Sequence, residues 1–120
     1  MYELTIDARF SAAHAIRING APEPTHGHDW LATVCIAGRT LDENDLLMDF
    51  HTIEDALTEC VARFHNNFLN EVPPFDKTNP TAERVAEHIG KTIQPILAGD
   101  VQLLWARVTE APGCTATWKP

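Results

Sequence analysis

Basic residues are scarce in this sequence of 120 residues. Nine lysines and arginines stand against seventeen aspartates and glutamates, which gives a formal net charge of -8 at pH 7. A chain of that charge repels phosphate groups, so we expect no nucleic acid and no membrane surface as a partner. The sequence also lacks an apolar run long enough to span a bilayer, and no signal peptide precedes the first predicted strand. We therefore expect a cytoplasmic protein.

Cysteine is also sparse. Cys35, Cys60 and Cys114 are odd in number and widely spaced, which argues against a disulfide framework and against a Cys-x-x-Cys metal site. We expect reduced and mostly buried thiols. Hydrophobic residues make up 44% of the chain, an ordinary share for a globular protein. No repeat or linker divides the sequence, so a single domain over residues 1–120 is predicted.

The hydrophobic pattern predicts the order strand, strand, helix, helix, strand, strand. Strict alternation or continuous apolar character predicts strands at 2–10, 31–37, 101–110 and 114–118. Apolar residues at helical spacing predict one helix after Phe50 and a second that begins at Pro80 with Asn79 as its cap. We expect an α+β fold, in which a four-stranded antiparallel sheet carries two helices on one face. The strand at 101–110 is apolar on both faces, which favours subunit association.

Three histidines are placed to bind a metal ion. His26 and His28 project to the same side of an extended backbone, because side chains alternate with a period of two. His14 ends the alternating segment upstream, and antiparallel pairing of the two strands would bring it beside the pair. Three imidazoles with an open fourth position form the catalytic zinc arrangement. The alternative is a polar turn at His26-Gly27-His28 and an ordinary, partly buried His14.

Six motifs occur in the order that is found in one protein family. They are Phe10-Ser11-Ala12-Ala13-His14, His26-Gly27-His28, Met48-Asp49-Phe50, Leu69-Asn70-Glu71-Val72-Pro73-Pro74-Phe75, Asn79-Pro80-Thr81-Ala82-Glu83 and Val108-Thr109-Glu110. Through these motifs the chain resembles the 6-pyruvoyl-tetrahydropterin synthases and the 6-carboxy-tetrahydropterin synthases of bacterial queuosine synthesis. The resemblance extends over essentially the whole chain.

The resemblance implies the tunnelling fold, in which trimers close a barrel and two trimers stack into a hexamer with active sites between subunits. It implies a small-molecule pterin as the ligand and one zinc ion per subunit, held by the three histidines. Glu110 resembles the family's pterin anchor, since one carboxylate can grip the two-donor edge of a pterin ring. Thr81 and Glu83 resemble the family's pterin-pocket positions.

The sequence departs from the family at the catalytic cysteine. Pro22 stands where the family has a cysteine four residues before His-x-His, and no other cysteine lies near it in the sequence. The family's Asp-His pair falls on His65-Asn66, or on Phe64-His65 after a shift of one residue. In either alignment His65 is the one candidate for that pair, and the thiol-centred triad is incomplete. The standard pyruvoyl-forming reaction is therefore not expected.

Glu23 offers a replacement for the missing thiol. The segment from Glu23 to His28 resembles a subgroup in which a glutamate three residues before His-x-His replaces the cysteine. Members of that subgroup are associated with cleaving the side chain of 7,8-dihydroneopterin triphosphate. A zinc-dependent pterin lyase with Glu23 as its base is one hypothesis. A pterin-binding protein that has lost the family's synthase activity is the other.

Overall fold

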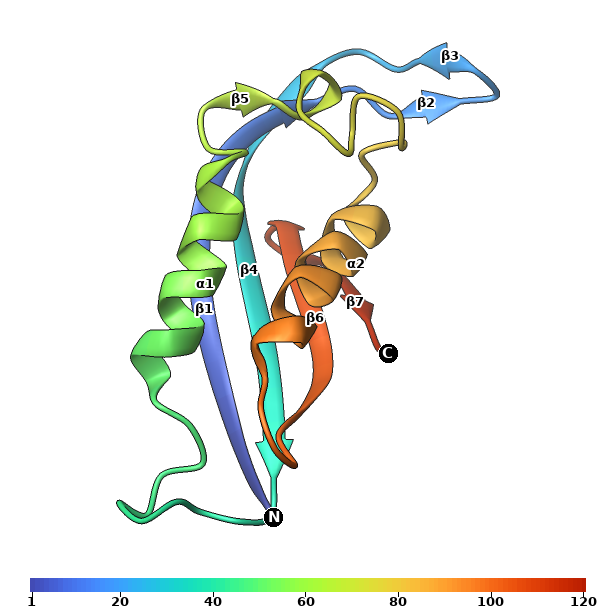
Figure 1. Ribbon diagram of the computed structural model, residues 1–120. Helices are drawn as coiled ribbons and strands as arrows, with labels where there is room; N and C mark the ends of the chain where they lie inside the picture. The colour runs from blue at the N-terminus through green and yellow to red at the C-terminus, as the bar shows by residue number, and fades with distance from the viewer.

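Residues 1–120 are described by the computed structural model, in which two α-helices cover one face of a β-sheet (Figure 1). The long strands β1 (Tyr2–His14) and β4 (His26–Gly38) pair antiparallel along their whole length. Strand β6 (Gln102–Ala111) pairs with β4, and β7 (Cys114–Trp118) forms the edge beyond it. The predicted α+β architecture and the order of its six main elements are confirmed.

Two short features were not predicted. Strand β5 (Asn67–Phe68) pairs parallel with β1, so the sheet is mixed and has five strands in the order β5-β1-β4-β6-β7. A separate ribbon of β2 (Arg17–Ile18) and β3 (Ala21–Pro22) turns at Asn19 and Gly20, whose φ angles are 53° and 80°. Asn-Gly is the preferred pair for such a turn, because both positions need positive φ.

The two long strands extend further than the alternation of the sequence indicated. Strand β1 continues from Phe10 to His14, and β4 begins at His26 rather than at Leu31. Small and polar residues interrupt the hydrophobic pattern in these extensions, while the backbone pairing continues without a shift. The three histidines therefore lie within strands, where the ladder fixes their positions.

Each helix begins at a side-chain cap. Asp49 caps α1 (Phe50–Ala62) by accepting the His51 N–H at 2.9 Å. Thr81 caps α2 (Ala82–Ile93) by accepting the Arg84 N–H at 3.2 Å. The short 3₁₀ helices η1 (Leu69–Glu71) and η2 (Gln94–Ile96) precede and follow α2.

The prediction that Asn79 caps the second helix is wrong. Its side chain instead bonds both backbone groups of Arg17: Oδ1 accepts the N–H, and Nδ2 donates to the carbonyl oxygen, each at 2.8 Å. A primary amide carries a donor and an acceptor, so it can satisfy both groups as a neighbouring strand would. The cap passes to Thr81, and Pro80 precedes the helix.

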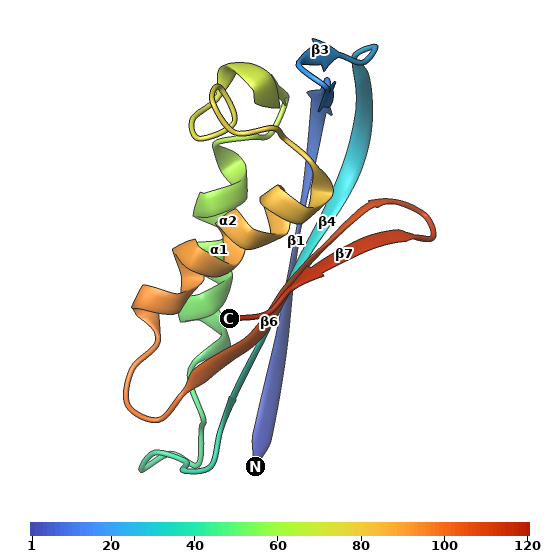
Figure 2. The same cartoon turned by 90° about the vertical axis from the view of Figure 1, so that its right-hand side faces the viewer.

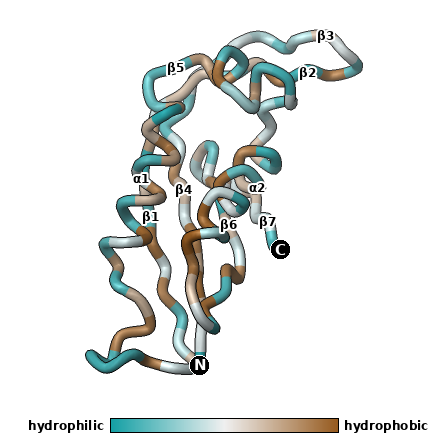
Figure 3. The backbone as a smooth tube through the Cα atoms, viewed as in Figure 1, coloured by the Kyte–Doolittle hydropathy of each residue, from teal (hydrophilic) through white to brown (hydrophobic).

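The core lies between the sheet and the helices. Trp30 and Phe10 stack with ring centroids 5.6 Å apart, and Phe64 packs against Phe10. In Figure 3, the tube is brown along parts of the sheet and strongly teal in the loop between β4 and α1. The helices leave the opposite face of the sheet uncovered (Figure 2). Neither α-helix has the length and apolar composition that would be needed to cross a bilayer.

A close contact joins α2 to the last strand. A Cβ atom on Gly90 would lie 2.4 Å from the indole ring of Trp118, a distance that real Cβ atoms do not reach. Gly90 is buried in the middle of the helix, where glycine costs about 0.5–1 kcal/mol relative to alanine. The glycine allows the indole of β7 to pack directly on the backbone of α2.

Candidate metal centre

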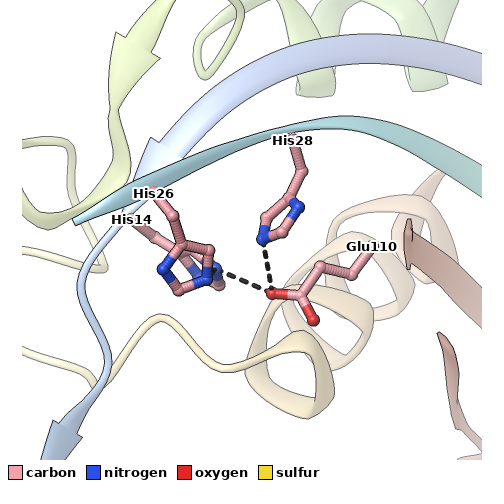
Figure 4. Close-up of side chains that lie close together, drawn as sticks. All are labelled: His14, His26, His28 and Glu110. Carbon is pink, nitrogen blue, oxygen red and sulfur yellow. Dashed lines mark hydrogen bonds and ion pairs between the residues drawn. The ribbon is translucent and has the colours of Figure 1, made fainter. Parts of the chain in front are cut away.

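The β1–β4 ladder brings the three predicted histidines together at one end of the sheet. His14 pairs directly with His26, and Ala12 pairs with His28, so all three side chains point to the face that carries the helices. The ring centroid of His14 lies 4.7 Å from that of His26 and 5.3 Å from that of His28. Figure 4 shows the three imidazoles converging.

Glu110 completes this group from strand β6. Its Oε1 lies 2.7 Å from Nε2 of His14 and 3.3 Å from Nε2 of His28 (Figure 4). Thr109 pairs with Thr115 and Ala111 with Cys114, so Glu110 is the extra residue of a β-bulge in the β6–β7 pairing. Bulges redirect side chains next to functional sites. Here the bulge accompanies a carboxylate that points into the histidine group, and we call His14, His26, His28 and Glu110 the four-residue cluster.

Backbone carbonyl groups set the orientation of two of the rings. Nδ1 of His14 donates to the Pro80 carbonyl oxygen at 2.8 Å, and Nδ1 of His26 donates to that of Pro24 at 3.1 Å. Each neutral ring then carries its lone pair on Nε2, since a carbonyl oxygen can only accept. These two Nε2 atoms lie 3.1 Å apart. Two lone pairs at that distance repel one another unless a cation lies between them.

His28 presents the same chemistry from a second direction. Its Nε2 atom is buried and has no hydrogen-bond partner. Burial lowers the pKa of His28 below its ordinary value; the Glu110 carboxylate acts against this shift, while His14 and His26 add to it. A neutral imidazole with a free lone pair is the form that binds metals.

The four-residue cluster therefore has the properties of a metal site. Its ligand atoms all lie within 4.8 Å of one another, and His14 is fully buried. The Nε2 atoms of His14 and His26 and the Glu110 carboxylate all act as acceptors, and His28 Nε2 has no hydrogen-bond partner. A divalent cation bound by imidazole and carboxylate ligands would neutralise this set. The residues present fit a metal ion, and the predicted convergence of the three histidines is observed.

Two asparagines hold the chain that follows His14. Asn70 bonds both backbone groups of Ala15, accepting its N–H at 2.9 Å and donating to its carbonyl oxygen at 2.8 Å. Asn79 does the same for Arg17. Together with the His14–Pro80 bond, these contacts fix the end of β1 to the segment that leads into α2. Such outer contacts orient metal ligands.

A cleft opens beside the four-residue cluster. It has a volume of about 530 Å³, and its lining includes Glu83, Glu110 and Cys114. Glu83 lies in the first turn of α2 and is exposed. The Thr81 hydroxyl lies two residues earlier and is engaged as the helix cap. We call this space the Glu83–Glu110 cleft.

The two predicted catalytic residues lie outside the four-residue cluster. Glu23 is exposed in the loop before β4, where its N–H donates to the Ile16 carbonyl oxygen at 2.7 Å and its side chain forms no hydrogen bond or ion pair. His65 lies beside β1, where its Nδ1 accepts the Ser11 N–H at 3.0 Å. One chain by itself does not bring either residue to the histidines.

One residue of the cleft could not be assigned from the sequence. Cys114 is distant in sequence from the segment before His26, where the family has its cysteine. It nevertheless lines the same cleft as Glu110, because the β6–β7 hairpin brings Cys114 close to Glu110. Its exposed thiol contrasts with the buried Cys35 and Cys60. In the sequence, only the short gap between the predicted strands at 101–110 and 114–118 indicated this proximity.

Comparison with known proteins identifies relatives over nearly the whole chain. The family model for 6-pyruvoyl tetrahydropterin synthase matches residues 3–120. A putative 6-carboxy-5,6,7,8-tetrahydropterin synthase of Archaeoglobus fulgidus is 29% identical over 86% of this chain and 91% of its own length. The 6-carboxy-5,6,7,8-tetrahydropterin synthase of Bacillus subtilis is also 29% identical, over 80% of this chain and 68% of its own.

Solved structures share the fold. The 6-pyruvoyl tetrahydropterin synthase of Caenorhabditis elegans superposes with a TM-score of 0.83 at 20% identity, over 100% of this chain and 97% of its own. The Plasmodium vivax 6-pyruvoyl tetrahydropterin synthase gives a TM-score of 0.78 at 17% identity, over 99% and 97%. Structures have also been solved of two variants of the Plasmodium vivax protein, in which a glutamate described as a catalytic residue is replaced.

Proposed function

This chain belongs to the 6-pyruvoyl tetrahydropterin synthase family, and from that premise we propose that it is a zinc-dependent lyase that cleaves the side chain of a reduced pterin such as 7,8-dihydroneopterin triphosphate. The observation that carries the proposal is the convergence of three imidazole rings and one carboxylate beside an open cleft. An acceptor-only cluster of this kind suits a cation, and the adjoining cleft leaves room for a small ring system.

In this proposal His14, His26 and His28 hold the zinc ion. Imidazole ligands suit zinc, and the Pro80 and Pro24 carbonyl groups keep the His14 and His26 rings in the binding tautomer. Bound zinc would supply Lewis acidity, which lowers the pKa of a hydroxyl group on the substrate side chain. The protein residues supply binding, orientation and proton transfer.

Pterin recognition is assigned to the Glu83–Glu110 cleft. A pterin ring presents a ring N–H beside an exocyclic amino group. The two oxygens of one carboxylate can accept one hydrogen bond from each of these donors. Glu110 is the anchor in this proposal, since its side chain is only 22% exposed and borders both the cluster and the cleft. Thr81 and Glu83, at the start of α2, would contact the pterin from the other side of the cleft.

Glu23 is proposed as the general base. Pro22 has no proton to exchange, so the residue beside it is the nearest carboxylate that could replace the family's thiol. A glutamate is also described as a catalytic residue in the Plasmodium vivax protein. In the proposed reaction Glu23 removes a proton from the substrate side chain.

We propose that the protein assembles into a hexamer of two stacked trimers. The helix-free face of the sheet carries Trp105 with the Arg107 guanidinium 4.2 Å from its ring centre, and β7 leaves one edge of the sheet unpaired. Both features suit contact with further copies. Assembly would also allow His65 to serve the cluster of a neighbouring subunit. Light scattering that shows a stable monomer at micromolar concentration would refute the assembly.

A second candidate is a pterin-binding protein without synthase activity. Two observations favour it: proline replaces the catalytic cysteine, and the Glu23 side chain makes no contact with the cluster within one chain. In that case the zinc-binding residues and the cleft would remain, while proton transfer would be lost.

Incubation of the zinc-loaded protein with 7,8-dihydroneopterin triphosphate, followed by chromatographic identification of products, tests the lyase. We expect Glu23→Gln to retain pterin binding and to lose turnover. We expect Glu110→Gln to weaken binding by about 2–5 kcal/mol, because it leaves a buried donor pair without its charged partner. Binding without any product, in the wild type as in Glu23→Gln, would select the binding protein. Equal pterin affinity in the wild type and Glu110→Gln, measured by calorimetry, would refute the anchor.

A further inference from the structure

We propose, on the basis of the pterin-binding function proposed above, that Glu110 is the fourth metal ligand of the pterin-free protein and that pterin binding withdraws it from the metal. One carboxylate would then perform two tasks in turn. The metal site is closed while the cleft is empty, and its fourth position opens when the pterin arrives.

The spacing of the four-residue cluster supports ligation by Glu110. A tetrahedral shell with metal–ligand bonds of about 2.0–2.1 Å has ligand–ligand edges of about 3.3 Å. The His14 and His26 Nε2 atoms are 3.1 Å apart, and Glu110 Oε1 lies 2.7 Å and 3.3 Å from the Nε2 atoms of His14 and His28. These three of the six edges lie near the tetrahedral value, and the other three are no longer than 4.8 Å.

The hydrogen-bond inventory supports the same assignment. Nδ1 of His14 and Nδ1 of His26 are already committed to carbonyl oxygens, so their Nε2 atoms have no proton for Glu110 in the neutral form. His28 Nε2 is buried with no hydrogen-bond partner, although Glu110 Oε1 lies 3.3 Å away. A carboxylate that is held against such atoms is stabilised by a shared cation rather than by direct hydrogen bonds.

The backbone keeps Glu110 at this position. Thr109 and Ala111 are both paired to β7, so the bulge is confined to Glu110 itself. Its side chain can rotate between the metal and the cleft without a movement of the strand, because it borders both. The sheet thus allows two positions of one side chain and fixes everything around it.

The two tasks exclude one another. A two-point grip on the pterin edge needs both carboxylate oxygens, and ligation of the metal occupies one of them. A pterin therefore competes with the metal for Glu110, and the coupling is reciprocal: the closed site lowers pterin affinity, and the bound pterin lowers the affinity for the metal. Release of Glu110 also opens the position to which a substrate hydroxyl group can bind.

The first experiment uses metal alone. Competition with a chromogenic chelator measures the zinc affinity of the wild type, of the isosteric Glu110→Gln, and of Glu83→Gln as a control with the same charge change in the same cleft. We expect Glu110→Gln to bind zinc at least tenfold more weakly, and Glu83→Gln to bind it as the wild type does. Equal affinities of all three proteins, with unchanged circular dichroism and elution volume, would overturn ligation by Glu110.

The second experiment uses cobalt(II) as a spectroscopic substitute for zinc. Azide should leave the visible spectrum of the wild type unchanged and alter that of Glu110→Gln, because only the variant has an exchangeable fourth position. Addition of 7,8-dihydroneopterin to the wild type should shift its spectrum and make it sensitive to azide. Pterin that binds by calorimetry but leaves the cobalt spectrum unchanged would overturn the exchange. If no pterin binds, the proposed function and the exchange both fail, while the metal-only result still decides whether Glu110 is a ligand.

Discussion

The inner side of the β1–β4 ladder carries apolar pairs along one half and imidazoles along the other. Ile6 faces Val34 and Phe10 faces Trp30 in the first half, and all four are buried. The pairing continues without a shift into the second half, which contains the three histidines. The backbone geometry is the same in both halves, so the difference lies in the side chains alone.

The two halves place different demands on their surroundings. Apolar side chains are stabilised by removal from water, at about 25 cal/mol per Å² of buried area, and need no further partner. In the second half, Nε2 of His14, Nε2 of His26 and the Glu110 carboxylate are acceptors that have no donor among them. The first half can therefore fold on burial alone, whereas the second half holds acceptor atoms that a bound cation would satisfy. Trp30 belongs to both, because its indole N–H donates to the Ala12 carbonyl oxygen at 3.2 Å and its ring contacts the His14 ring edge-on.

The largest expected effect comes from removing the Trp30 side chain, which contacts both halves. Trp30→Ala should lower the free energy of unfolding by about 3–5 kcal/mol, since it leaves a cavity in the core. Denaturant titration of the metal-free protein measures the change. Ile18→Ala, at a half-exposed site on β2, should stay within about 0.5 kcal/mol of the wild type. A loss below 1 kcal/mol for Trp30→Ala would mean that the core does not depend on this residue.

The second prediction concerns the imidazole half of the β1–β4 ladder, from which two candidate metal ligands are removed. The double substitution His26→Ala, His28→Ala should abolish zinc uptake, measured by elemental analysis, and leave the stability of the chelator-treated protein nearly unchanged. Zinc at 100 times its dissociation constant should stabilise the wild type by about 2.7 kcal/mol. The double variant should show no such gain. Metal content equal to that of the wild type would show that the ligand assignment is wrong.

The third prediction concerns the asparagine that holds the end of β1. Asn70→Ala should lower the free energy of unfolding by about 1–3 kcal/mol, because both backbone groups of Ala15 lose their partner. Zinc affinity should fall as well, because His14 precedes the freed residue. Asn67→Ala is the matched control, since its exposed amide makes one bond, to the Arg63 carbonyl oxygen. An equal change in zinc affinity in both variants would contradict a positioning role for Asn70.

The smallest expected effect is a pH dependence at His88, on helix α2. His88 packs between Phe64 and Phe75, and burial, aided by the Arg63 charge, lowers its pKa below 6.5. The unfolded chain therefore takes up a proton first as the pH falls, so stability is full above pH 6.5 and declines below it. Denaturant titration from pH 8 to pH 5 should show a steeper decline in the wild type than in His88→Gln, in which His28, whose pKa is also lowered by burial, still contributes. Parallel curves would contradict it.

The sequence predicted the architecture well because the periodic elements are strongly patterned. The β7 bounds, Cys114–Trp118, agree with the predicted strand, and the apolar stripe of α1 is buried as expected. The convergence of the histidines followed from the alternation of side chains together with antiparallel pairing. The extensions of β1 and β4 were missed because they contain small and polar residues, whose strand conformation depends on the neighbouring strand.

The features that were not predicted depend on contacts between distant parts of the chain. Asn79 satisfies every local rule for a helix cap, but Arg17 offers its side chain two hydrogen bonds instead of one. The position of Glu110 depends on a bulge, which shifts the register at one residue and leaves no mark in the hydrophobic period. Cys114 reaches the cleft only because the hairpin folds back. Such details require the three-dimensional fold.

The contact between Gly90 and Trp118 has a consequence for the width of the Glu83–Glu110 cleft. Helix α2 carries Glu83 on one side of the Glu83–Glu110 cleft, and the β6–β7 hairpin carries Glu110 on the other. The distance between these two walls is set where α2 and β7 pack together, because no atom separates the Gly90 backbone from the indole. A methyl group at position 90 would push the walls apart. Under the proposed function, Gly90 would limit the ring systems that the cleft accepts without touching any of them.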